Sequence, residues 1–79
     1  SYHLAYLQNG LESEGQLKGL GYLYIAAEAP YLGAEVMVEG IENGIIEEDE
    51  EIYRAIGSAY YQSREMEKAL PWMERWLKA

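Results

Sequence analysis

The most strongly charged stretch of this sequence is a run of five consecutive acidic residues, Glu47 to Glu51. Such a run could hold a cation or bind a basic partner. It lacks the alternating spacing and the turn glycine of a calcium-binding loop. Carboxylates in the first turn of a helix are stabilised by the helix macrodipole and need no ligand. We therefore expect the run to begin a helix, and we expect no metal site.

The remaining side chains do not form a catalytic set. His3 is the single histidine and cysteine is absent, so neither a Ser/His/Asp nor a Cys/His arrangement is visible. The carboxylates are numerous, but a high count is not a positioned acid–base pair. Gly15, Gly19 and Gly21 lack the preceding strand and the following Lys-Ser/Thr of a phosphate-binding loop. We predict that the protein is not an enzyme and uses no cofactor.

The composition limits the class of partner. The chain has 79 residues, which make one small domain or part of one. Its 49% of hydrophobic residues is too high for a disordered segment. The net charge of −8 disfavours nucleic acid and anionic membrane surfaces, so a charged partner is expected to be cationic. The longest nearly uncharged apolar run, residues 19–27, is too short for membrane insertion.

Two amphipathic stripes in the C-terminal half predict an antiparallel pair of helices. Both follow the 3.6-residue period, and the polar segment Gln62 to Arg64 separates them as a turn. Small side chains at a crossing let two helix backbones approach closely, so we expect Gly57 to face Ala69. The stripe residues are Tyr53, Ile56, Gly57 and Tyr60 on the first helix, and Ala69, Leu70 and Met73 on the second.

The same spacing occurs a second time upstream, in Leu17, Leu20, Gly21 and Tyr24, followed by Gly33 and Met37. Gly21 and Gly57 are 36 residues apart, and Gly21 is expected to face Gly33. The pattern resembles the tetratricopeptide repeat (TPR), a helix–turn–helix unit with the form W-x2-L-G-x2-Y…A-x3-F…P. The resemblance covers nearly the whole chain. It implies an all-α fold, an α-solenoid of antiparallel helix hairpins.

The resemblance divides the chain into a preceding half-repeat helix and two repeats. The half-repeat is residues 1–10, and it ends at Asn9-Gly10 because glycine after an apolar helix is a stop signal. Repeat one covers residues 13–44 and repeat two covers residues 47–79. The whole is expected to be one domain and a fragment of a longer array.

Local signals predict the bounds of the helices. Ser13-x-x-Gln16 has the form of a capping box, so the first helix of repeat one should run from about Glu14 to Ala27. Pro30 suits the first helical position, and the second helix should continue to about Asn43, before Gly44. The last helix should run from about Arg64 to Lys78.

Stacked helical hairpins form a concave surface, and such arrays bind proteins or peptides there. The alternative for Tyr22 and Tyr61 is that they only cover the core. Lys18 and Arg54 could hold a peptide carboxylate, although the asparagines of chaperone-tail-binding members of the family are absent. By the resemblance, the concave face contains Lys18, Tyr22, Ile25 and Ala26 in repeat one, and Arg54, Ser58, Tyr61 and Gln62 in repeat two.

Large apolar residues near both ends predict self-association. Trp76 stands where repeat one has Gly40, a small residue that lets the following unit dock. Identical chains could bury such ends by stacking or by exchanging a helix. The alternative function is therefore a self-assembling solenoid segment, a homo-oligomer or part of a larger array. The self-association residues are Tyr2, Leu4, Trp72, Trp76 and Leu77.

Residues 29–46 also resemble repeats of bacterial proteins associated with TonB-type energy-transduction systems. That resemblance implies a Gram-negative cell envelope or periplasm. The composition alone allows a cytoplasmic location as well, so the compartment stays open.

Overall fold

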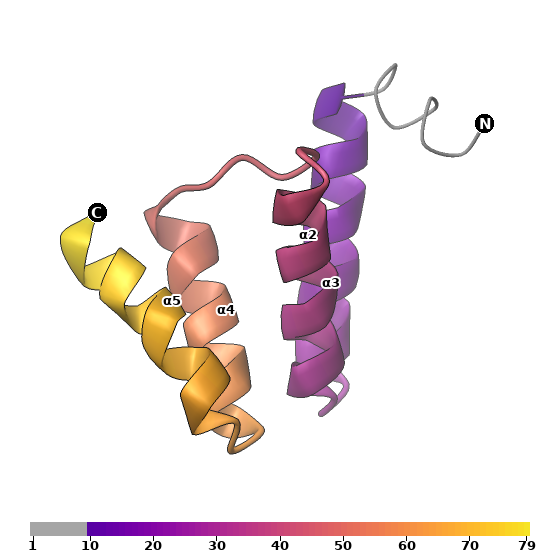
Figure 1. Cartoon of the computed structure of the whole chain (residues 1–79). Coiled ribbons are helices and arrows are strands. Elements are labelled where there is room, and N and C mark those ends of the chain that lie inside the picture. Colours follow the sequence, from indigo (N-terminus) through magenta and orange to yellow (C-terminus); the bar gives the residue numbers. More distant parts are fainter. Residues whose placement is uncertain (1–9) are drawn as a thin grey trace.

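The structure is a computed structural model that describes residues 10–79. Four α-helices follow one another in this part of the chain: α2 (Gly10–Ala26), α3 (Pro30–Glu42), α4 (Glu50–Gln62) and α5 (Met66–Lys78). Figure 1 shows two antiparallel hairpins, α2 with α3 and α4 with α5. Because each helix packs on the next one, α3 and α4 form the junction between the hairpins. The predicted all-α class is confirmed.

α2 begins earlier than the sequence indicates. Its first residue is Gly10, which was expected to end the preceding helix, and the predicted start at Glu14 is one turn too late. Ser13 therefore lies inside α2, where it cannot take the extended backbone of a capping residue, and the predicted capping box is wrong. Ser13 is also buried. The half-repeat helix predicted upstream lies outside the described residues.

The two hairpin turns have the same backbone conformation, 36 residues apart. Glu28 has a φ angle of 64° and Arg64 a φ angle of 65°. In each turn the next amide donates to the carbonyl five residues earlier, at 2.8 Å in the first turn and 2.9 Å in the second. This is the pattern of a helix that ends with one left-handed residue. The predicted turn at Gln62 to Arg64 is confirmed, although α5 begins only at Met66.

α3 begins at Pro30, as predicted. Gly44 has a φ angle of +73°, so it acts as the predicted stop beyond the end of α3. The amides of Ile45 and Ile46 then both donate to the Gly40 carbonyl, at 2.8 and 3.0 Å. A Cβ atom on Gly40 would lie 2.5 Å from Cδ1 of Ile46. A larger residue at position 40 would displace the Ile46 side chain, so glycine here lets the loop pack closely on α3.

The acidic run forms the start of α4, as predicted. Asp49 is the N-cap residue, since its carboxylate accepts a hydrogen bond from the Ile52 amide at 2.8 Å. The next two glutamates lie in the first turn, where the macrodipole stabilises negative charge. The backbone amide of Glu47 donates to the Glu14 carboxylate on α2 at 2.8 Å. The run is thus used to begin α4 and to join it to α2.

α4 lies at the centre of the hydrophobic core. It packs between α3 and α5 and contributes the largest share of buried apolar side chains. α2 adds Leu17 and Ile25, which are partly buried against the same cluster. The fully enclosed core residues are Ala34 and Met37 of α3, Ile46 of the loop, Ile52, Ile56, Ala59 and Tyr60 of α4, and Ala69 of α5.

Glycine sets how closely the helices of the first hairpin approach. A Cβ atom on Gly33 would lie 2.6 Å from the Gly21 carbonyl oxygen, so α2 and α3 cross at this pair, as predicted. The predicted pairing of Gly57 with Ala69 in the second hairpin is not confirmed. The atom nearest to a Cβ on Gly57 is Cγ of Met73, at 3.1 Å, and no atom of Ala69 is among the three nearest. Met37 lies in the same way against Gly21 in the first hairpin, at 2.8 Å.

We expect Gly33→Ala to lower the free energy of unfolding by about 1–3 kcal/mol, because the new methyl group would meet a main-chain oxygen that cannot easily move. Gly19→Ala is the matched control. Nothing lies within 4 Å of a Cβ there, so the better helix former should add about 0.5–1 kcal/mol. Urea unfolding followed by circular dichroism measures both changes. Equal midpoints for the two variants would contradict the close crossing at Gly33.

Candidate functional site

The residues predicted for the concave face form two stripes, one on α2 and one on α4. Spacings of three or four residues place each stripe along one side of its helix. The stripes meet where the Tyr22 hydroxyl donates to the Glu51 carboxylate at 3.5 Å. Tyr22 is 39% exposed and Tyr61 is 56% exposed, so both rings keep free area. We term this area the α2–α4 surface; its residues are Lys18, Tyr22, Ala26, Arg54, Ser58, Tyr61 and Gln62.

Charged groups of α4 surround the Tyr22 hydroxyl. Burial and the Glu51 carboxylate raise the pKa of Tyr22, while the Arg54 guanidinium acts in the opposite direction. Arg54 makes no ion pair with the described residues. The α2–α4 surface therefore presents an aromatic ring and, close to it, a guanidinium that has no ion-pair partner among the described residues.

Lys18 is held by the fold. Its ammonium lies 3.7 Å from the Glu14 carboxylate. The same carboxylate oxygen accepts the hydrogen bond from the Glu47 amide, so the group links α2 to the segment before α4. Lys18 and Arg54, which the sequence groups as one carboxylate-binding pair, thus differ in availability. Of these two, Arg54 makes no ion pair with residues 10–79 and can meet an anionic group of a partner.

Arg54 and Ser58 also line a pocket of about 290 Å³ with three residues of α5, namely Met73, Trp76 and Leu77. The sequence assigned the first two residues to partner binding and Trp76 and Leu77 to self-association. The structure brings both groups together on one side of the molecule. Met73 was expected only as a packing residue of the hairpin, and its place in this pocket follows from the observed crossing of α4 and α5.

Ile25 belongs to the interior more than to the surface. It is half-buried, and its Cγ1 atom lies 2.8 Å from the position of a Cβ on Gly33. Its side chain therefore packs between α2 and α3. Tyr2 and Leu4, which were predicted to take part in self-association, lie outside the described residues.

Trp72 stabilises the second hairpin. It is half-buried, and its ring centre lies 6.1 Å from that of Tyr53 on α4. The Arg75 guanidinium lies 4.2 Å from the Trp72 ring centre. Aromatic and cation–π contacts at these distances contribute to packing. Of the predicted self-association residues on α5, Trp76 and Leu77 are the exposed ones.

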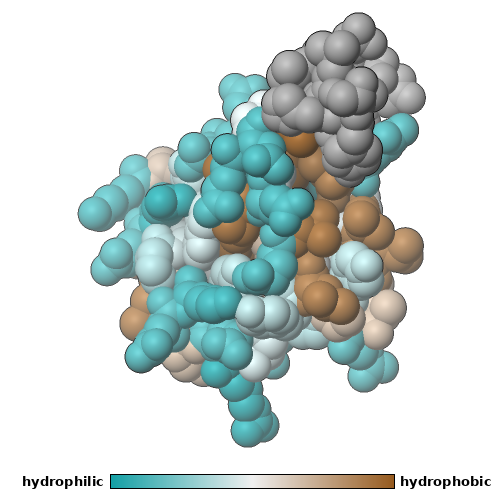
Figure 2. Space-filling model, turned by 45° about the vertical axis from the view of Figure 1, so that its right-hand side comes forward, coloured by the Kyte–Doolittle hydropathy of each residue, from teal (hydrophilic) through white to brown (hydrophobic). Residues whose placement is uncertain are grey.

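A groove of about 420 Å³ between α2 and α3 is a feature that the sequence does not predict. Leu20 of α2 and Leu32 of α3 line it, and both are exposed. Figure 2 shows apolar residues gathered on the side of the molecule that these two helices form. The sequence did contain a signal for this groove. Leu20 occupies the position that Ile56 occupies 36 residues later, where the side chain is buried by a neighbouring helix, but Leu20 itself is exposed.

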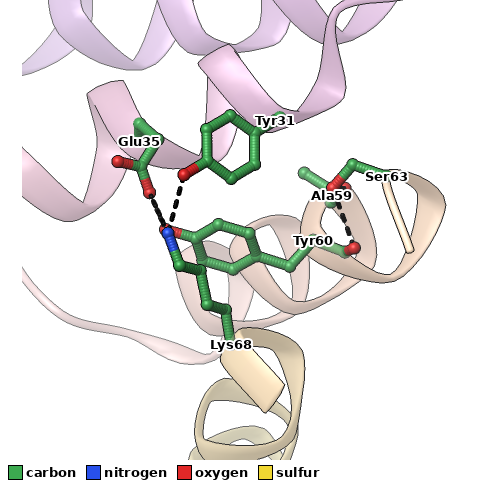
Figure 3. Close-up of polar contacts among 6 residues, drawn as sticks. All are labelled: Tyr31, Glu35, Ala59, Tyr60, Ser63 and Lys68. Atoms are coloured by element: carbon green, nitrogen blue, oxygen red, sulfur yellow. Dashed lines mark hydrogen bonds and ion pairs between the residues drawn. The ribbon is translucent and has the colours of Figure 1, made fainter. Parts of the chain in front are cut away.

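A polar cluster joins α3, α4 and α5 at the junction between the hairpins (Figure 3). The Tyr60 hydroxyl donates to the Glu35 carboxylate at 2.5 Å. The Lys68 ammonium donates to the Tyr31 hydroxyl at 2.7 Å and lies 3.6 Å from Glu35. The rings of Tyr31 and Tyr60 pack edge to face, with centres 6.0 Å apart. We term these four residues the junction cluster.

The electrostatics of the junction cluster favour a structural role. Burial, together with the hydrogen bond to Glu35, raises the pKa of Tyr60. A phenol with a raised pKa stays protonated at neutral pH, so it is not a nucleophile or a base. The hydrogen bond to Tyr31 raises the pKa of Lys68, which stays charged. The cluster therefore holds the two hairpins together and sets how α2 and α4 lie beside each other.

Residues 10–79 offer few other kinds of site. Within this range no three His, Cys, Asp or Glu side chains are placed to hold a metal ion. None of the described helices has the length and apolar character needed to cross a membrane. Comparison with protein-family models, with curated proteins and with solved structures gave no match in any of the three. The surfaces described above are therefore the basis for assigning a function.

We expect Tyr60→Phe to lower the free energy of unfolding at pH 8 by about 1 kcal/mol, since one hydrogen bond is lost and water can reach Glu35. The pKa of Tyr60 is raised in the fold, whereas an unfolded tyrosine ionises near the ordinary value of 10.0. The parent chain should therefore lose this stabilisation as the pH rises above about 10.

Urea unfolding at a series of pH values between about 8 and 12 tests the sign of this effect, the lower limit lying well below the ordinary tyrosine pKa. The difference in unfolding free energy between the parent and Tyr60→Phe should shrink as the pH rises. A constant difference across the series would show that the Tyr60 hydroxyl does not have a raised pKa in the fold.

Proposed function

We propose that this protein binds an extended peptide or protein segment on the α2–α4 surface and that it is not an enzyme. The observation that carries the proposal is the contact of the exposed Tyr22 with Glu51 of α4, close to the Arg54 guanidinium, which makes no ion pair with the described residues. Tyrosine supplies a large contact area at a low cost in conformational entropy. Arginine supplies directed donors, and both residue types are enriched in protein interfaces.

The repetition of local structure supports an array of TPR-like units. Both hairpin turns use the same motif, and the contact of Gly21 with Met37 recurs as the contact of Gly57 with Met73. In stacked hairpins the first helices of successive units line a common surface. On this proposal α2 and α4 are those first helices. Tyr22 and Arg54 then belong to neighbouring units of one binding surface.

The charge of the surface favours a cationic partner. Glu51 lies beside Tyr22, and other carboxylates of the acidic run surround the same end of α4. With a net charge of −8 on the chain, such groups attract basic segments and raise the rate of association. Arg54 adds one opposite charge, which favours an acidic group or a carbonyl at one place in the ligand. The expected ligand is a basic segment with an apolar or aromatic side chain placed against Tyr22 or Tyr61.

We expect Tyr22→Ala and Tyr61→Ala each to weaken ligand binding about tenfold, since truncation of an aromatic contact residue typically costs more than 1 kcal/mol. The probes are labelled peptides selected on the full chain from a random peptide display library. Fluorescence polarisation measures their affinity for each variant. Leu32→Ala is the control, because it removes exposed apolar area from the groove between α2 and α3.

Two outcomes would count against this assignment. Unchanged affinity in both tyrosine variants, with intact helical circular dichroism, would place the ligand elsewhere. Selection of mainly acidic peptides, or affinity that does not fall with added salt, would contradict the proposed charge complementarity.

A further inference from the structure

Two hollows lie between α4 and α5, at the end of the hairpin where α4 begins and α5 ends (Figure 1). The apolar hollow is the pocket of about 290 Å³ whose α5 residues are Met73, Trp76 and Leu77. The acidic hollow has a volume of about 380 Å³, and it is lined by Glu50, Glu51, Arg54 and Trp76. Arg54 and Trp76 line both hollows, so the two adjoin each other and share one aromatic wall.

The side chains of the acidic hollow are available to a ligand. Trp76 is 37% exposed, so part of its ring can still be covered. Glu50 is exposed and makes no ion pair with the described residues. The carboxylate of Glu51 accepts from the Tyr22 hydroxyl at 3.5 Å, which is long for a hydrogen bond between two oxygen atoms. Two carboxylates against one guanidinium give this hollow a net negative charge, which favours a cationic group.

One turn earlier on α5, the chain already holds a cation between a tryptophan and the acidic run. The Arg75 guanidinium lies 4.2 Å from the centre of the Trp72 ring and 3.8 Å from the Glu48 carboxylate. Trp72 and Trp76 are four residues apart, so they lie on one side of α5. The acidic hollow offers the same two kinds of group, an indole ring and carboxylates, but no cation of residues 10–79 stacks on Trp76.

We propose that the acidic hollow binds an arginine side chain of the peptide ligand, stacked on Trp76 and paired with Glu50 and Glu51. Arginine suits this place better than lysine, because its planar guanidinium stacks on an aromatic ring while its edge donates to carboxylates. The ligand arginine would thus repeat, one turn further along α5, the position that Arg75 takes between Trp72 and the acidic run.

The apolar hollow then selects a second residue of the same ligand. In an extended peptide, alternate side chains point to the same side, so two adjoining hollows receive residues that are two positions apart. The residue two positions from the arginine should therefore be large and apolar, to fill the space beside Met73 and Leu77. Arg54 lines both hollows, so its guanidinium can donate to a main-chain carbonyl between the two bound side chains.

This inference rests on the proposed function and names the ligand residues that the protein reads. The acidic hollow adjoins the α2–α4 surface, because Glu51 contacts Tyr22 and because Arg54 belongs to both. A peptide that covers Tyr22 therefore reaches Trp76 by crossing the start of α4. The hollows extend the binding surface onto α5, whose residues are not part of the α2–α4 surface.

The ligand side of the proposal is tested with labelled peptides selected on the full chain from a random display library. The selected peptides should be enriched in an arginine two positions from a large apolar residue. Replacing that arginine by alanine should weaken binding to the parent about tenfold, and replacing it by lysine about threefold. Fluorescence polarisation measures each affinity.

The protein side is tested with two variants that each remove one group of the acidic hollow. Trp76→Leu keeps an apolar side chain but removes the ring, and Glu50→Gln removes a charge. Each should weaken binding of the arginine peptides about threefold and leave binding of their alanine counterparts unchanged. Glu67→Gln is the matched control, because Glu67 is also an exposed glutamate in the first turn of a helix and lines neither hollow. Helical circular dichroism checks that every variant is folded.

Three results would overturn the proposal: selected peptides without an enriched arginine, an unchanged preference for arginine over alanine in Trp76→Leu, or equal losses of affinity in Glu50→Gln and Glu67→Gln. The last result would show only a general effect of charge. Tyr22→Ala separates this proposal from the proposed function. A loss of affinity in Tyr22→Ala without one in Trp76→Leu keeps the α2–α4 surface and rejects the hollow, whereas the reverse result supports the hollow and rejects that surface.

Discussion

Every property that needs both hairpins depends on the packing of α4 against α3. Ile52 and Ile56 are among the largest fully buried side chains, and a domain of this size has few of them. Each contributes about 1.5–3 kcal/mol through burial. Apolar contact alone tolerates sliding, whereas the hydrogen bond from Tyr60 to Glu35 requires one geometry. The junction cluster therefore selects one arrangement of the hairpins, and with it the residues of α2 and α4 that lie side by side.

The order and type of the helices could be predicted because their signals are local. Pro30 presets the backbone of a first helical turn, and Gly44 accepts the left-handed conformation cheaply, so a few residues encode the bounds of α3. The start of α2 was predicted wrongly, because Ser13 has the pattern of a cap but lies buried inside the helix. Likewise, residue size alone pairs Gly57 with Ala69. The nearest atom to a Cβ on Gly57 instead belongs to Met73, as Met37 does for Gly21, and this contact exists only after the helices have packed.

The candidate site, like the fold, was predictable where local helical spacing defines it and was not predictable where contacts between the hairpins define it. Helical spacing alone indicates which residues of α2 and α4 share a side, but it does not show which charges are free. Glu14 accepts a hydrogen bond from the backbone amide of Glu47, 33 residues later, and Glu51 accepts one from the hydroxyl of Tyr22, 29 residues earlier. Such contacts exist only after packing. Lys18 pairs with Glu14 one turn earlier on α2, whereas Arg54 makes no ion pair with the described residues, although both occupy the same position in the repeated pattern.

A fold made of similar units must prevent its helices from packing on the wrong neighbour. Trp76 can do this, because its large side chain stands where the repeated pattern has Gly40. If the α5 face were a copy of the α3 face, α4 could pack on either, and chains could exchange hairpins. Gly40 accepts the Ile46 side chain, whereas the residue 36 positions later on α5 is the large Trp76. Steric exclusion of the wrong partner is a general route to specificity. The one marked departure from the repeat therefore favours the packing of Ile46, in the loop before α4, on α3.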